Sequence, residues 1–379
     1  MNFNILMLVS FGLLVGCSDT TRARPANAAQ DTDTPTLEAA YVGVTSLPDL
    51  FSLGSDGRAL AVSTADNRVF VIADSLERDI AMRRGRGPGD VEAVGRIFAV
   101  DAGYGLWDDA LQRVSVFDSS GRVLFTESPV AWRGMGGLQV VKRLDDGRYL
   151  GVRTSRFGRV SVGSVVADSV DVLVGDIKAA PLRLVRLPAG QRLLVDGSPA
   201  PRMVTVPKVS PQLVLACRET FTVVTADSVR VFSYGGSPIK AYPRFWPAFP
   251  LQREQLISSE LGQEAMSPDS FRSAKRFLEA QLAVHDSIVP EPIADSEGNF
   301  WLSVPGGKRR YANFTPEGQT LRVAQLPPGA MVLLADARRF FAMSPEADDA
   351  EPHLVIMNLP AVTSQSRSAD TENCTTVRF

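Results

Sequence analysis

A short unit that recurs along the chain constrains its fold more than any other feature. Gly57, Gly103 and Gly147 are spaced by about 45 residues, and each lies in a turn with an acidic residue nearby, beside a short apolar or β-branched run. Glycine can adopt the positive φ at which a hairpin reverses, and an acidic side chain can accept hydrogen bonds from turn amides. This rhythm continues from about residue 40 onward. It predicts an all-β chain of repeated antiparallel units.

The same unit returns near the C-terminal end of the chain. Residues 295–302 read as a turn followed by a strand, and residues 311–318 read as a second strand with its own turn. Four-stranded sheets arranged around a central axis form a closed all-β fold with a repeat of about this length. We therefore predict that residues 38–379 form a β-propeller.

The chain resembles the six-bladed β-propeller proteins related to NHL repeats, which are common as bacterial lipoproteins. The likeness rests on the loop 85–90, on the strand pair 106–107 and 114–118, and on the unit 295–301 with its turn 314–318. The resemblance implies six blades. Seven blades remain an alternative, because residues 160–240 fit the repeat poorly. The shared motifs mark blades, so the resemblance implies no particular chemistry.

One segment interrupts the β pattern. Residues 251–265 and 268–284 are predicted to form two helices, the second capped by Ser267 with Pro268 at its first position. The second helix carries an apolar face that must pack on something. We expect the pair, an insertion at about 251–285, to cover apolar surface at one end of the propeller; the alternative is a lid or a partner-docking element. The expected face consists of Phe271, Ala274, Leu278 and Leu282.

The first 17 residues have the pattern of a bacterial lipoprotein signal. An apolar run from Ile5 to Val15 precedes Gly16 and Cys17, and its length suits a signal core of about 7 to 15 residues rather than a membrane span of about 20. We expect residues 1–16 to be removed and Cys17 to be lipidated, with a cleaved secretory signal as the alternative. Residues 17–37 hold few large apolar side chains and are predicted to be a flexible tether. Ser18 favours the outer membrane of a Gram-negative bacterium, so the predicted location is the cell envelope.

Two further cysteines, Cys217 and Cys374, lie in a chain that should fold in an oxidising compartment. A disulfide between them is one prediction. Two separate thiols are the other, with Cys217 buried beside the apolar strand 213–216. The sequence does not decide between these alternatives.

The overall charge argues against nucleic acid as a partner. The chain carries 40 basic and 42 acidic side chains, for a formal net charge of −2, whereas a nucleic-acid-binding protein needs a concentrated basic surface. Its two histidines, His285 and His353, lie in no two-histidine metal motif and beside no nucleophile signature. Zinc catalysis is therefore not expected, and no catalytic or metal-ligating residue is predicted.

Two kinds of loop could still bind an ion. A glycine-rich loop could hold an anion with its backbone amides and with arginines, although a turn between blades is the simpler interpretation. Acidic loops could hold Ca²⁺ through oxygen ligands, but they lack calcium-loop spacing, and solvated loops are the simpler interpretation. The anion-loop residues are Arg84, Gly85, Arg86, Gly87 and Gly89, close to Arg83. The acidic residues are Asp108, Asp109, Glu346, Asp348, Asp349 and Glu351.

These observations lead to two hypotheses of different classes. The first is a monomeric, membrane-anchored propeller that binds an envelope protein, peptide or glycan through its loops and catalyses nothing. The alternative is a metal-dependent hydrolase or lactonase-like enzyme with its site at the mouth of the central channel. Such an enzyme would need carboxylates that converge from several blades, which spacing along a sequence cannot show.

Overall fold

The computed structural model divides the chain into two compact units, Met1–Thr32 and Asp33–Phe379. The first unit lies outside the residues that the structure describes, and only the second is discussed below. The described residues are 36–54, 56–101, 103–132, 135, 137–154, 161–196, 201–206, 213–217, 219–225, 228–243, 249–262, 266–288, 292–303, 310–345, 352–360 and 375–378.

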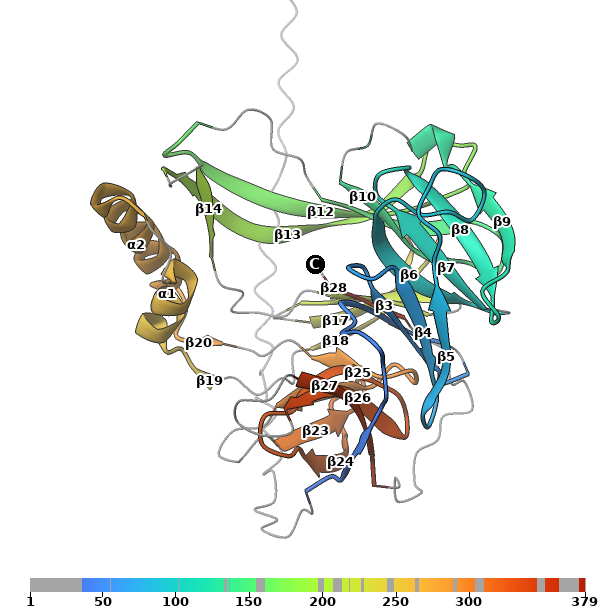
Figure 1. Ribbon diagram of the computed structural model, residues 1–379. Helices are drawn as coiled ribbons and strands as arrows, with labels where there is room; N and C mark the ends of the chain where they lie inside the picture. Colours follow the sequence, from blue (N-terminus) through green and yellow to red (C-terminus); the bar gives the residue numbers. More distant parts are fainter. Residues whose placement is uncertain are drawn as a thin grey trace, which may run out of the picture. The chain divides into compact units, whose positions relative to one another are not determined.

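The described strands form six antiparallel sheets of four or five strands, which are the blades of a propeller (Figure 1). Blade 1 contains β2 (Leu50–Leu53), β3 (Ala59–Ser63), β4 (Arg68–Ile72) and β5 (Leu76–Ala81). Blade 2 contains β6 (Val94–Val100), β7 (Gly103–Asp108), β8 (Arg113–Asp118) and β9 (Val123–Glu127). Blade 3 contains β10 (Leu138–Arg143), β11 (Tyr149–Thr154), β12 (Val165–Gly175), β13 (Leu182–Val195) and β14 (Arg202–Thr205).

The remaining blades come from the second half of the chain and from its first strand. Blade 4 contains β15 (Leu213–Ala216), β16 (Thr220–Val224), β17 (Ser228–Ser233), β18 (Pro238–Pro243) and β28 (Thr375–Arg378). Blade 5 contains β21 (Ile293–Ala294), β22 (Phe300–Ser303), β23 (Arg310–Phe314) and β24 (Thr320–Gln325). Blade 6 contains β25 (Met331–Ala335), β26 (Arg339–Pro345), β27 (Pro352–Asn358) and β1 (Ala39–Tyr41). The prediction of a six-bladed, all-β propeller is confirmed.

The ring is closed in two ways. The first described strand, β1, pairs with β27 and completes blade 6, so one sheet combines a strand from the start of the domain with three strands from near its end. Six hydrophobic clusters also join neighbouring blades all the way round, one of them joining blade 6 back to blade 1. Ring closure leaves each blade packed on both faces, which explains why strands such as β3 are buried at every position.

The glycine turns are confirmed in part: Gly57 and Gly147 adopt positive φ, whereas Gly103 is the first residue of β7 and does not. At Gly121 and Gly298 the backbone has φ of 86° and 79°, a conformation that suits glycine. Each turn begins with an aspartate, Asp118 or Asp295, whose carboxylate accepts hydrogen bonds from amides two and four residues later. The repeated acidic residue is therefore part of the hairpin itself.

Two helices form where the sequence predicts them. The first is shorter than predicted: α1 spans Arg253–Leu261, and Gly262 follows it at a φ of 59°. The second, α2, spans Pro268–Leu282, and the Ser267 side chain accepts a hydrogen bond from the amide of Ser270, as the cap prediction requires. The short pair β19 (Phe249–Pro250) and β20 (Ser287–Ile288) closes the base of this insertion.

The packing of the helices differs from the expectation. Ala274, Leu278 and Leu282 are buried, but Phe271 is 42% exposed, because Ser270 falls on the buried row of residues four apart. Among the described residues, the main packing partners of the helices are β13 and β14, with which they share a seventh hydrophobic cluster. We had expected them to pack on an end of the ring.

Candidate binding face

The strand directions define two faces of the propeller. The first strands of neighbouring blades, such as β2 and β6 or β21 and β25, contact one another and therefore lie innermost. Antiparallel order then places the connections from one blade to the next, together with the middle turn of each blade, on one face. We call this the link face; it includes the loop 82–93 and the turn 109–112. The opposite face, which carries the first and last turn of each blade, is called the turn face.

Two segments extend from the ring on the side of the link face and contact each other: an extension of blade 3 and the helical insertion. The strand β11 pairs only with Val170–Gly175 of β12, so Val165–Ser169 and the β13 residues opposite them extend past the blade as an arm. The helical insertion leaves the ring on the connection between blades 4 and 5. Figure 1 shows the arm reaching from the blades to α1 and α2. We call the end of the arm, with β14 and both helices, the accessory module.

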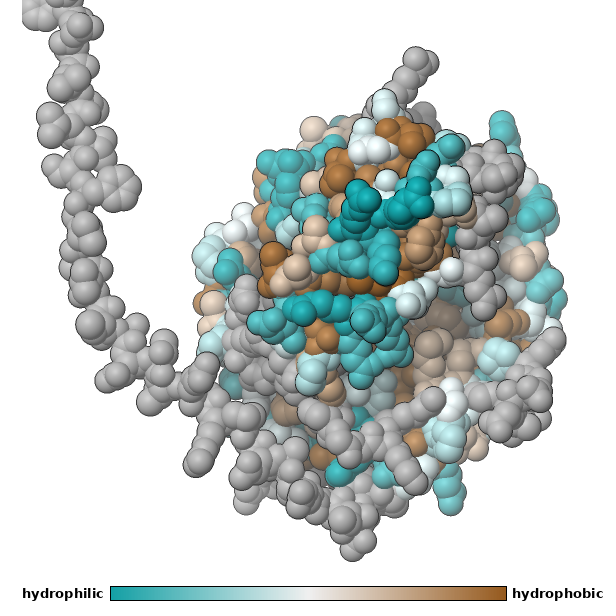
Figure 2. Space-filling model, turned by 90° about the vertical axis from the view of Figure 1, so that its left-hand side faces the viewer, coloured by the Kyte–Doolittle hydropathy of each residue, from teal (hydrophilic) through white to brown (hydrophobic). Residues whose placement is uncertain are grey.

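The accessory module has its own core. Leu193 and Val195 of β13 and Val204 of β14 pack against Leu278 and Leu282 of α2. Polar contacts add to this packing, since Glu260 of α1 accepts a hydrogen bond from the amide of Thr205 at 2.8 Å. Figure 2 looks onto this side of the molecule and shows hydrophilic residues interspersed with apolar ones. The sequence predicted the helices but not their packing on the arm, because these two parts of the module are separated by the whole of blade 4.

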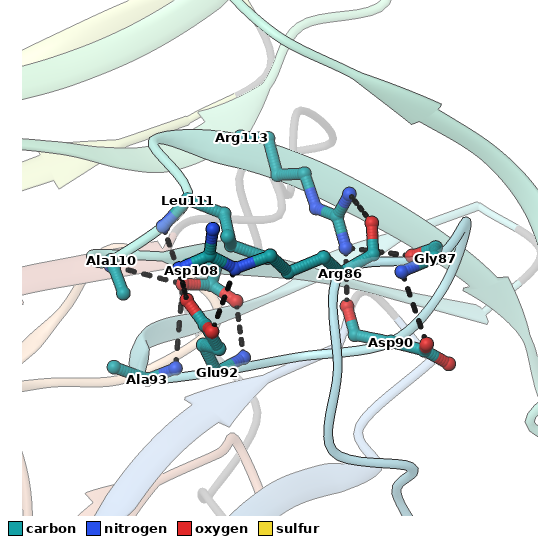
Figure 3. Close-up of polar contacts among 9 residues, drawn as sticks. All are labelled: Arg86, Gly87, Asp90, Glu92, Ala93, Asp108, Ala110, Leu111 and Arg113. Carbon is teal, nitrogen blue, oxygen red and sulfur yellow. Dashed lines mark hydrogen bonds and ion pairs between the residues drawn. The ribbon is translucent and has the colours of Figure 1, made fainter.

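The glycine-rich loop lies on the link face and folds around the carboxylate of its own residue Asp90 (Figure 3). The Asp90 side chain accepts hydrogen bonds from Arg83 at 2.7 Å and from the amide of Gly87 at 3.1 Å. The hydrogen bond from Arg83 holds the pKa of Asp90 below its ordinary value. The amides of Gly85 and Gly89 donate to Val91 and Thr126.

The basic side chains of this loop are also engaged. Arg86 pairs with Glu92 at 3.0 Å, and Arg113 of β8 donates to the carbonyls of Arg86, Gly87 and Asp90 (Figure 3). The backbone of Arg84 forms an isolated β-bridge with Val91, and its side chain is exposed. The loop amides named above and the side chains of Arg83 and Arg86 therefore serve internal partners, and an anion at the Gly87 amide would have to displace Asp90.

The two acidic residues at the end of β7, Asp108 and Asp109, have structural partners as well. Asp108 is 2% exposed and accepts hydrogen bonds from four backbone amides, those of Glu92, Ala93, Ala110 and Leu111 (Figure 3). Asp109 accepts a hydrogen bond from the indole of Trp107 at 2.8 Å. In the described part of the chain, no three His, Cys, Asp or Glu residues gather closely enough to hold a metal ion. The other Ca²⁺ candidates, Glu346, Asp348, Asp349 and Glu351, lie outside the described residues.

The axis of the ring is partly filled by the chain itself. The C-terminal strand β28 pairs with the inner edge of β15 and also lies close to β2 of blade 1. Cys217, directly after β15, is disulfide-bonded. The register has Ala216 opposite Thr375, and extending it by one residue predicts Cys374 as the partner. Cys374 and the lipidation candidate Cys17 both lie outside the described residues, so these two assignments stay predictions.

A polar pocket of about 280 Å³ opens on the turn face between blades 1 and 2. Arg58 lies at its wall but is already paired with Asp56 and Glu77, each at 2.6 Å. The phenol of Tyr104, whose pKa is raised by burial, also lines the pocket. The pocket is lined by three acidic residues and two basic ones, so it offers no surplus positive charge, and we assign it no ligand.

The histidines lie apart from these features. His285 follows α2, and its carbonyl accepts a hydrogen bond from Arg253. The ring of His353 on β27 lies edge-on to Tyr41, with 5.1 Å between ring centroids.

Neither helix in the described part of the chain has the length and apolar character that a bilayer crossing requires.

Comparisons with known proteins add little beyond the fold. No protein-family model matches the chain, and no curated protein matches it. Among solved structures, a Bacteroides fragilis protein thought to be exported is 10% identical, with a TM-score of 0.47 over 89% of this chain and 98% of its own. A DUF4221 family member from Bacteroides vulgatus is 8% identical, with a TM-score of 0.40 over 86% and 96%. Virginiamycin B lyase from Staphylococcus aureus is also 8% identical, with a TM-score of 0.38 over 86% and 99%. The fold assignment rests on the strands described above, and the relation to NHL-repeat proteins stays a prediction.

Proposed function

We propose that this protein is a lipid-anchored binding module of the cell envelope, held by Cys17 at the outer membrane of a Gram-negative bacterium. Its link face would engage an envelope partner without catalysing a reaction. Of the three partner classes that the sequence allows, we favour a protein over a peptide or a glycan. The choice rests on the surface of the accessory module.

The observation that carries this proposal is the second core outside the ring. Six clusters already join every blade to its neighbours, and each blade has at least four strands without β14 or the helices. Ring closure therefore does not require the accessory module. Ordering more than 40 residues costs conformational entropy, which packing of the cluster must offset. A structure that is built in addition to the ring and projects from one face is well placed to contact a partner.

Exposed apolar side chains at this end of the molecule support a protein partner. Phe271 is 42% exposed and Val284, directly after α2, is 78% exposed. Val162 and Val165, at the end of the arm, are each 53% exposed. Aromatic and aliphatic side chains at the centre of a protein interface contribute much of its binding energy when water is excluded from them.

The test is affinity purification from native envelopes after chemical crosslinking. The lipidated wild type is compared with a Phe271→Ser, Val284→Ser variant. A matched control carries Leu124→Ser and Ile239→Ser, because these residues are 46% and 51% exposed on the outer strands of blades 2 and 4. We expect a stoichiometric partner that the module variant loses and the control retains. A partner lost equally by both variants, or by neither, would contradict the proposed contact.

A further inference from the structure

A cluster of arginines on blade 3 surrounds one buried carboxylate. Arg153 of β11, Asp171 of β12 and Arg186 of β13 lie in register across three neighbouring strands. Arg186 donates two hydrogen bonds to Asp171, at 2.6 and 3.0 Å, and Arg153 donates one. Arg183 approaches the same carboxylate to 3.8 Å. We call Arg153, Arg183 and Arg186 around Asp171 the arginine cluster.

The arginine cluster has more positive than negative charge. Three guanidinium groups share one carboxylate, which leaves a surplus of two positive charges. The nearby Asp168 does not reduce this surplus, because it pairs with a fourth arginine, Arg192, at 2.5 Å. In the described residues, no second carboxylate forms an ion pair with the cluster. A set of like charges in one place is favourable only if something offsets their repulsion.

Burial divides the cluster into an inner anion and outer cations. The side chain of Asp171 is 3% exposed, whereas those of Arg183 and Arg186 are each 54% exposed and that of Arg153 is 31% exposed. The arginines hold the pKa of Asp171 below its ordinary value, Arg186 contributing most, so the carboxylate stays ionised at neutral pH. The buried carboxylate of Asp171 therefore holds the guanidinium groups in place, while the arginine side chains stay partly exposed to solvent. Side chains held in this way lose less conformational entropy when a ligand binds.

We propose that the arginine cluster binds a phosphate group that can carry two negative charges, either free in solution or as the phosphate monoester of a lipid headgroup. The planar guanidinium fork matches the oxygens of phosphate with paired hydrogen bonds. A phosphate monoester carries about 1.5 to 2 negative charges at neutral pH, which matches the surplus of two. A carboxylate carries one and would leave part of the surplus uncompensated.

Both sources of phosphate are within reach of this site. If Cys17 is lipidated, as proposed above, a tether of about 20 residues spans at most about 70 Å, so blade 3 can approach the membrane surface. Free phosphate needs no anchor. The site can therefore exist whether or not the accessory module docks a protein.

The test uses the full chain with Cys17→Ser, so that the anchor does not bring it to vesicles. An Arg183→Gln, Arg186→Gln variant is compared with a control carrying Arg230→Gln and Arg338→Gln, two exposed arginines on other blades. Both variants lower the net charge by two. Unfolding midpoints are measured first; if the cluster variant does not fold, Arg183→Gln alone replaces it, because Arg183 is the most distant from Asp171.

Binding is measured with two probes at low ionic strength. Titration calorimetry uses inorganic phosphate, and sedimentation uses vesicles of phosphatidic acid, whose headgroup is a phosphate monoester, mixed with phosphatidylcholine. We expect at least tenfold weaker binding for the cluster variant and less than a twofold change for the control. An effect with both probes indicates that phosphate itself is sufficient, and an effect with vesicles alone indicates the lipid headgroup. If the wild type binds neither probe, or if both variants weaken binding equally, the proposal is overturned.

Discussion

Replacing Asp295 by asparagine should make the protein more stable at neutral pH. Asp295 is 2% exposed in the turn between β21 and β22, and burial raises its pKa to about 6 from an ordinary value of 3.8. Hydrogen bonds from Asn299, Asn313 and Glu297 oppose the shift but do not cancel it. The folded protein therefore binds a proton on Asp295 between pH 4 and 6, where the unfolded chain does not.

The sign of the effect follows from this difference in proton binding. Stability falls with rising pH wherever the folded state holds more protons than the unfolded state. For Asp295 the loss begins near pH 4 and is complete above pH 6. A shift of about two pKa units corresponds to about 3 kcal/mol of unfolding free energy. Asparagine cannot ionise, so the variant should avoid this loss.

Asparagine can also replace the contacts of the carboxylate. Its carbonyl oxygen can accept the hydrogen bonds from the amides of Glu297 and Asn299, at 3.0 and 2.9 Å in the wild type. Its amide group would lie beside Asn313, whose side-chain oxygen is buried and has no hydrogen-bond partner among the described residues. A rotated Asn313 amide could accept from the new donor.

The assay is urea unfolding of the wild type and Asp295→Asn from pH 4 to pH 8, followed by the fluorescence of the buried tryptophans. Relative to the wild type, the variant should gain about 2 to 3 kcal/mol between pH 4 and pH 8. Asp118→Asn is the control, because Asp118 begins the same kind of turn but its pKa is lowered, chiefly by the Ser120 hydroxyl. Its stability relative to the wild type should change little between pH 4 and pH 8, because Asp118 is mostly ionised over this range in both the folded and the unfolded state. A difference between Asp295→Asn and the wild type that does not vary with pH would refute the reasoning.

Three further predictions concern the module, the anchor and the disulfide. Leu278→Ala should lower the free energy of unfolding of the accessory module by about 2 to 5 kcal/mol. Amide hydrogen exchange should therefore accelerate in both helices and β14 but not in blades 1 and 6. Equal acceleration everywhere would mean that the module does not have a separate core. Cys17→Ser should release the protein from membranes without changing its unfolding curve, whereas sedimentation with envelopes after a high-salt wash would show that the lipid anchor is wrong. Alkylation without reducing agent should add no label at Cys217 or Cys374, and two added labels would exclude the bridge.

The sequence predicted the elements that local chemistry determines. Glycine beside acidic residues predicted the turns at Gly57 and Gly147. Ser267 correctly predicted the start of α2. The assignment of Phe271 to the buried face was wrong. Both Phe271 and Ser270 lie about one helical turn before Ala274, and the sequence alone does not show which of the two faces the packing partner of α2. Ser270 occupies the buried position instead.

The candidate sites depended on contacts between distant residues, which spacing along the chain could not reveal. Gly87 and Asp90 are close in sequence, yet only the fold shows that Asp90 fills the loop. Arg153 and Arg186 are 33 positions apart and meet because β11, β12 and β13 are neighbours in one blade. The alternation of charged and apolar residues along β12 and β13 was the available signal, but the irregular spacing of blade 3 concealed it.

The most direct test of the central claim is site-specific photocrosslinking in the native envelope. A photoreactive amino acid replaces Phe271 on α2 in one sample and Leu124 on β9 in another. We predict one reproducible protein adduct from position 271 and none from position 124. No adduct from position 271, or the same adducts from both positions, would contradict the claim that this protein binds its partner through the accessory module.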